Sequence, residues 1–98
     1  MEEIKLIKIK NPFDKHDRTE ELVDYHNENL LTIRNAYFPK EIDVVVSVNG
    51  GVVQEKDLMF ITLRPGDEVV FIPNIEGGGD IFRAVAMLAV VAVAIWAP

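Results

Sequence analysis

The stretch "LMFITLRPGDEVVFIP", residues 58–73, decides the expected fold of this 98-residue chain. Pro65 and Gly66 predict a tight turn. The run after this turn, Glu68 to Ile72, is apolar and rich in β-branched residues, so it lacks the polar face that an outer strand shows to water. We therefore expect this run to form the central strand of a sheet.

The segment before it, "DVVVSVNGGVVQ" (residues 43–54), predicts a β-hairpin. Two β-branched runs flank the pair Asn49-Gly50, and this pair supplies the positive φ angles that a two-residue turn needs. A chain of this length holds one domain, because a single core usually occupies about 100–200 residues.

One soluble helix is expected, over residues 27–39. Asn27 or Asn29 can cap its first turn, and Pro39 ends it. Its apolar residues recur at helical spacing and predict one face that packs on a sheet. These residues are Leu30, Leu31, Ile33, Tyr37 and Phe38.

Two further strands are expected near the beginning of the sequence. Residues 4–10 alternate apolar side chains with lysines except at Ile7, which predicts a strand with one solvated face. Residues 11–18 are dense in turn formers and predict a loop. The next strand pairs back on the first, with either Leu22 or, one register over, Val23 and Tyr25 facing the interior.

The order strand, strand, helix, strand, short strand, strand predicts the α+β class, with a mixed sheet and one helix packed across it. This layout matches the ubiquitin-like β-grasp fold. We expect the β-grasp domain over residues 1–76, a glycine hinge at Gly77, Gly78 and Gly79, and a hydrophobic helix over residues 80–98.

The last segment is almost entirely apolar. As a helix, the 18 residues 81–98 would reach about 27 Å, against a bilayer core of about 30 Å. Such a helix is hydrophobic all round, and we expect that the domain cannot cover it by itself, because Leu30, Ile33 and Tyr37 of the expected helix over 27–39 already use the sheet face. We therefore expect the segment to need partners: other protein, copies of itself, or a membrane. The residues expected to pack on them are Ile81, Phe82, Val85, Leu88, Val91, Ile95 and Trp96.

Charge and composition argue against several functions. Ten Lys and Arg stand against 16 Asp and Glu, a net charge of −6, which opposes direct binding to nucleic acid. Without cysteine or close histidine spacing, His16 and His26 predict no metal site. The triple glycine lacks the Lys-Ser/Thr of a phosphate-binding loop. We expect no enzyme, no catalytic or metal residue and no cofactor.

The acidic side chains between residues 20 and 28 predict a solvated face instead of a catalytic pair. They are Glu20, Glu21, Asp24 and Glu28.

The run "GDEVVFIP" (residues 66–73), with Gly77-Gly78 shortly after it, resembles the end of the sulfur-carrier β-grasp proteins, which include the molybdopterin-synthase small subunit and the thiamine sulfur carrier. In those families the chain ends at Gly-Gly, and the terminal carboxylate becomes a thiocarboxylate. Here 19 residues come after Gly79, so carrier chemistry would need cleavage after Gly78 or Gly79. A sulfur carrier is the alternative hypothesis.

A second resemblance covers the glycines and the apolar segment after them. The turn at Gly66-Asp67-Glu68, the linker "FIPNIEGGG" (residues 71–79) and the small-residue apolar segment from Asp80 are similar to the phage tail assembly protein I family. The resemblance implies a structural protein of the tail tip of a virion, made in the host cytoplasm. Its implied partners are the tail hub, other tip proteins and the host membrane during DNA delivery. A membrane-tethered ubiquitin-like adaptor of a cell is a third, weaker hypothesis.

Overall fold

The computed structural model describes residues 3–9, 18–24, 29–74 and 79–96, and of residues 79, 80, 89 and 91–96 it describes the main chain alone. The elements come in the order β1 (Glu3–Ile9), β2 (Arg18–Asp24), α1 (Leu30–Tyr37), β3 (Asp43–Val48), β4 (Gly51–Val53), the 3-10 helix η1 (Glu55–Phe60), β5 (Glu68–Asn74) and α2 (Gly79–Trp96).

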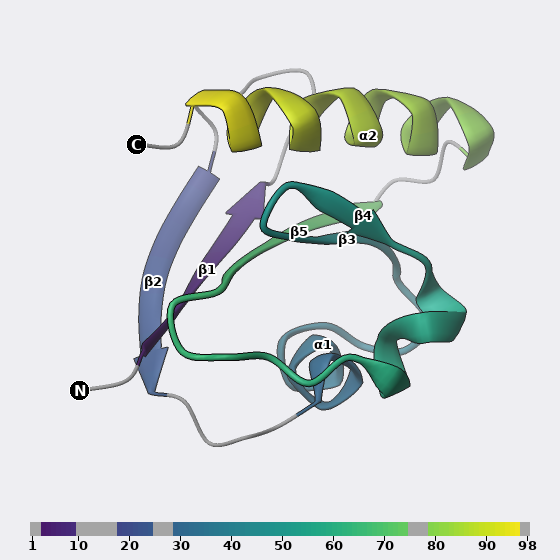
Figure 1. Ribbon diagram of the computed structural model, residues 1–98. Coiled ribbons are helices and arrows are strands. Elements are labelled where there is room, and N and C mark those ends of the chain that lie inside the picture. Colours follow the sequence, from purple (N-terminus) through teal and green to yellow (C-terminus); the bar gives the residue numbers. More distant parts are fainter. Residues whose placement is uncertain (1–2, 10–17, 25–28, 75–78, 97–98) are drawn as a thin grey trace.

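The five strands form one mixed sheet in the order β2-β1-β5-β3-β4. The β1–β5 pair is parallel, and the β1–β2, β3–β5 and β3–β4 pairs are antiparallel. Figure 1 shows α1 on one face of this sheet and α2 on the other. The predicted α+β class is confirmed, and so is the central position of β5.

The first apolar core lies between the sheet and α1. Leu30 and Ile33 of α1 pack against Ile4 and Leu6 of β1 and against Phe71 of β5, and all five are buried. The Phe71 ring also meets two aromatic rings at the end of α1, in a stacked contact at 6.4 Å and an edge contact at 5.6 Å between centroids. Those rings belong to Tyr37 and Phe38.

A second apolar core lies on the opposite face of the sheet. Phe82, Ala86 and Val90 of α2 pack against apolar side chains of three strands, and the whole cluster is buried. The strand residues are Ile7, Ile9, Val45, Val70 and Ile72. This arrangement differs from the expectation that no face of the sheet is left for the last helix.

The solvated face expected for the first strand is therefore wrong. Ile4 and Leu6 of β1 belong to the core under α1, whereas Ile7 and Ile9 belong to the core under α2. Each face thus receives its own apolar pair, because successive side chains of a strand point to opposite faces. The break in alternation at Ile7 marks the start of the second buried face.

The register of β2 settles the alternative left open by its sequence. Ile4 of β1 pairs with Val23, and Val23 packs against the core on the α1 side. Leu22 is 64% exposed. The interior position is therefore Val23, and Tyr25 lies outside the described residues.

The predicted hairpin is confirmed, with Asn49 and Gly50 as its turn. Their φ angles of 52° and 88° are both positive, as the tight hairpin turn requires. The Asn49 side chain also accepts a hydrogen bond from the Glu68 amide at 2.9 Å and donates one to Asp67 at 3.0 Å. The turn between β3 and β4 is thereby fixed to the beginning of β5.

Helix α1 begins and ends with side-chain caps. Asn29, one of the two predicted caps, accepts a hydrogen bond from the Thr32 amide at 2.9 Å. Near the other end, the buried guanidinium of Arg34 donates to the carbonyl oxygens of residues just past the helix, namely Phe38, Pro39 and Ile42. Arg34 thus fixes the path of the chain from α1 into β3.

Adjacent residues of β1 provide a direct test of the two cores. Leu6 and Ile7 are 1% and 0% exposed and face opposite sides of the sheet. We expect Leu6→Ala and Ile7→Ala each to lower the free energy of unfolding by about 2–5 kcal/mol, because each leaves a cavity. Urea denaturation measures both.

The control is Leu22→Ala on β2, where the exposed side chain should contribute less than about 0.5 kcal/mol. A cost for Ile7→Ala as small as that of the control, beside a large cost for Leu6→Ala, would show that the second face is not covered.

Candidate functional site

The residues predicted to contact partners lie on α2. Some of them pack on the protein's own sheet, and others are exposed to solvent. Phe82 is 8% exposed and packs on the protein's own sheet, and Val85 is half-buried. Ile81 and Leu88 are 73% and 72% exposed. The surface available to another molecule is therefore only one part of the predicted set.

For the other predicted residues, the structure describes only the main chain or nothing. The main chain of Val91, Ile95 and Trp96 continues α2, and their side chains are outside the described part. Gly77 and Gly78 also lie outside the described residues, so the predicted hinge stays a prediction. Gly79 is the first residue of α2, one position before the expected start of the helix.

The outer face of α2, defined here by Ile81, Ala84 and Leu88, points away from the sheet. These positions are three and four residues apart and thus share one side of a helix. All three side chains are exposed, whereas Phe82, Ala86 and Val90 hold the opposite side against the sheet. In the sequence, Val91 and Ile95 continue the same spacing. Large exposed apolar side chains in one row are typical of a protein or membrane contact.

An ion pair ties the first turns of α2 to the sheet. Arg83 donates from Nη2 to both carboxylate oxygens of Asp43 on β3, at 2.9 Å and 3.1 Å. Because the two side chains are 47% and 33% exposed, the pair contributes at most about 1 kcal/mol. It joins α2 to β3 directly next to Phe82, which anchors the helix in the second core.

A cavity of about 610 Å³ lies beside this ion pair, between α2 and the β4 end of the sheet. Val52 on β4 and Met87 on α2 line it and are 39% and 43% exposed. Lys56 and Glu55 at its rim carry opposite charges. The cavity thus extends the apolar surface of α2 towards the β4 edge.

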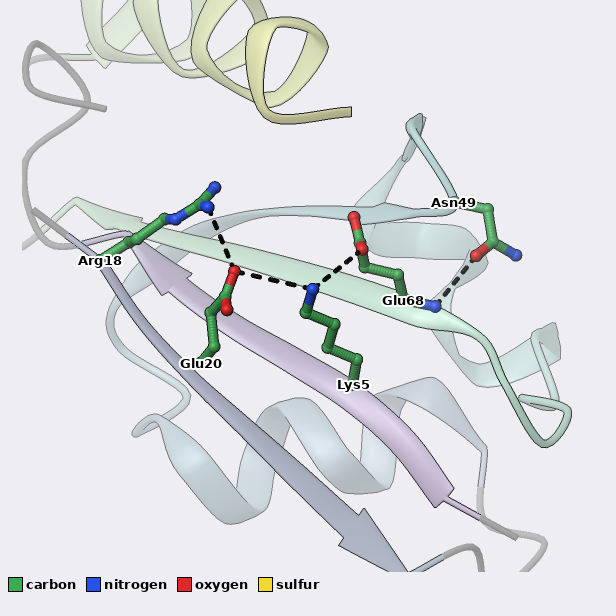
Figure 2. A network of polar contacts seen from close by, with 5 residues as sticks. All are labelled: Lys5, Arg18, Glu20, Asn49 and Glu68. Carbon is green, nitrogen blue, oxygen red and sulfur yellow. Dashed lines mark hydrogen bonds and ion pairs between the residues drawn. The ribbon is translucent and has the colours of Figure 1, made fainter. Parts of the chain in front are cut away.

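A network of polar side chains borders the second core on the other side (Figure 2). The Lys5 ammonium lies 3.7 Å from Glu20 and 3.8 Å from Glu68, and Arg18 lies 3.2 Å from Glu20. These ion pairs join β2, β1 and β5 next to the buried Ile7. We interpret the network as structural, since it neutralises charges where the apolar cluster ends.

Glu20, Glu21 and Asp24 are exposed, as predicted, and Glu28 lies outside the described part. They do not share one face, because Glu21 accepts a hydrogen bond from Tyr37 of α1 at 2.8 Å, whereas Glu20 pairs with Lys5 on the other side of the sheet. His16 and His26 are also outside the described part. Among the described side chains, no group of three or more His, Cys, Asp or Glu could hold a metal ion.

Four large apolar side chains among the described residues are exposed although the sequence pattern does not predict it. Met59 and Phe60, at the end of η1, are 54% and 75% exposed, and Val52 and Met87 are 39% and 43% exposed. In the sequence Met59 and Phe60 form an apolar run with Leu58, which is buried, so composition does not separate them. Leu22, one of the two interior alternatives for the second strand, is instead 64% exposed. The charged residues on either side of it in the sequence are typical of an edge strand.

Comparisons with known proteins give no relationship for this chain: no family model, curated protein or solved structure matches it. In the described part of the chain, no helix is both long enough and apolar enough to cross a membrane.

Two alanine substitutions on α2 separate its inner and outer faces. We expect Phe82→Ala to lower the free energy of unfolding by about 3–5 kcal/mol, because it empties a site in the second core. Leu88→Ala should cost less than about 0.5 kcal/mol, since its side chain is exposed and alanine favours a helix. Thermal and urea unfolding measure both, and equal costs would contradict the placement of α2.

Proposed function

We propose that this chain is a structural component of a bacteriophage tail tip, with a β-grasp domain that docks on the tail hub and a last helix that contributes a second contact surface. The observation that carries the proposal is the outer face of α2, where Ile81 and Leu88 remain exposed although the helix packs on its own domain. The resemblance of residues 66–91 to the tail assembly protein I family supplies the biological setting.

The sheet supports the β-grasp part of the proposal. Its order, β2-β1-β5-β3-β4, has the two outer hairpins antiparallel and β1 parallel to β5 at the centre, and α1 connects β2 to β3 across one face. A mixed sheet that holds one helix in this way is compatible with a ubiquitin-like layout. Helix α2, on the other face, is an addition to that layout.

The packing of α2 favours a protein partner over a membrane as its resting environment. To enter a bilayer, the helix would have to remove Phe82, Ala86 and Val90 from the sheet. That would leave five buried strand side chains in water, and each contributes on the order of 1.5–3 kcal/mol when buried. Membrane insertion during DNA delivery would therefore need a trigger that offsets this cost.

The same packing weighs against the alternative function, a sulfur carrier released by cleavage after Gly78 or Gly79. Cleavage there would cut the covalent link between α2 and the rest of the domain. The apolar side chains on the second face of the sheet pack on α2, so they would be exposed to water if the cut helix dissociated. Peptide mapping of the protein from its native source tests the alternative. A peptide that runs unbroken across Gly77–Gly79 excludes it, and a free carboxylate at either glycine supports it.

A paired substitution tests the docking role of the outer face. We expect phage that carry Ile81→Lys with Leu88→Lys to incorporate this chain into tails at least about tenfold less, because two charges would have to be buried in an apolar contact. Quantitative mass spectrometry of purified tails measures the incorporation. Cross-linking from the exposed Lys40 and Lys56 in wild-type tails identifies the partner.

The matched control is Glu41→Lys, which changes the net charge by the same amount at an exposed site away from α2. The control should incorporate normally, and both proteins should melt at the wild-type temperature. Normal incorporation of the lysine variant would refute docking through this face.

A further inference from the structure

Strand β2 is an edge of the sheet, and it is open to another strand. It lies at the end of the order β2-β1-β5-β3-β4, and no described strand pairs with its outer side. With seven residues it is longer than β4, the opposite edge, which has three. Its outward N–H and C=O groups therefore provide a template for an extended peptide.

A groove runs beside this edge, between β2 and α1. Its volume is about 400 Å³, and Val23 of β2 and Ile33, Ala36 and Tyr37 of α1 line it. Ala36 is an exposed, small residue, so α1 has no bulky side chain to close the groove at that point. An apolar side chain of a peptide paired with β2 would lie next to Val23 and enter this groove.

The other face of the same strand is also suited to an added strand. Leu22 is 64% exposed, and its neighbours on the same face of β2, Glu20 and Asp24, are charged. A neighbouring strand would cover Leu22 on one face while filling the groove beside Val23 on the other. Leu22 is the one exposed apolar side chain among the charged residues of β2, and an added strand would remove it from water.

The charges of β2 indicate the chemistry of the partner. β2 carries three acidic side chains and one basic side chain, Arg18. Glu20 is already paired with Lys5 and Arg18, and Glu21 accepts a hydrogen bond from Tyr37. Asp24 is exposed, borders the groove and makes no ion pair with the described residues, and strand alternation puts its side chain on the face of Leu22. This excess of negative charge attracts a strand that carries Lys or Arg and repels β2 of a second copy of this chain.

We propose that β2 is a docking site for an extended peptide segment in which apolar residues alternate with Lys or Arg. The peptide pairs with the outer edge of β2, places its apolar side chains in the groove beside Val23 and Tyr37, and directs its basic side chains to the opposite face, towards Asp24. This site lies across β2 and α1 and is separate from the outer face of α2.

Titration of the full chain with a capped nine-residue peptide of alternating lysine and valine, monitored by NMR at low salt, tests the proposal. We expect the largest amide shifts in β2 and in α1 around Ala36. The variant Ala36→Trp should block the groove and abolish the shifts, while its fold is monitored by circular dichroism. Largest shifts in α2 or β4 would overturn the proposal.

Two sets of variants separate strand pairing from simple charge attraction. Asp24→Lys should weaken binding about tenfold, whereas the charge-matched Glu41→Lys should bind nearly like wild type. Because a paired strand uses alternate amides, N-methylation of either the valines or the lysines should abolish binding, and methylation of the other set should preserve it.

Binding that is insensitive to both methylation patterns, or equal effects of the two charge variants, would overturn the proposal. So would a dimer in sedimentation experiments that the Ala36→Trp variant dissociates, since the occupant of the edge would then be a second copy.

Discussion

The structure depends on the burial of both faces of one sheet. The central strand β5 sends Val69 and Phe71 to one face and Val70 and Ile72 to the other, and all four are buried. A sheet with two apolar faces needs a layer on each side in water. Helix α1 supplies one layer and α2 supplies the other, so the apolar last segment completes the domain's core in addition to presenting a surface.

This constraint explains which features could be predicted from the sequence. The central position of β5, the hairpin at Asn49-Gly50, the cap at Asn29 and the α+β class each come from a local pattern. The second core does not come from a local pattern, because Ile7 is one residue in a strand whose other apolar residues alternate with lysine. The burial of Ile7 depends on Val45, Val70 and Ile72, which long-range strand pairing brings to the same face of the sheet.

The candidate surfaces were predicted less completely for the same reason. Apolar residues occur around the whole circumference of α2, so the sequence does not predict which side of the helix packs on the sheet. Phe82 and Leu88 have similar hydrophobicity, yet they are 8% and 72% exposed. The edge position of β2 and the groove beside Val23 depend on strand order and on where α1 crosses the sheet. A local sequence pattern predicts neither the strand order nor the position of the helix.

The contact between α2 and the sheet is the central claim, and nuclear Overhauser effects test it most directly. In the full chain with labelled methyl groups, the ring protons of Phe82 should show effects to methyl groups of Val45, Val70 or Ile72, since these residues share one buried cluster. A spectrum in which α2 is helical but Phe82 shows no effect to any sheet methyl group would contradict the account.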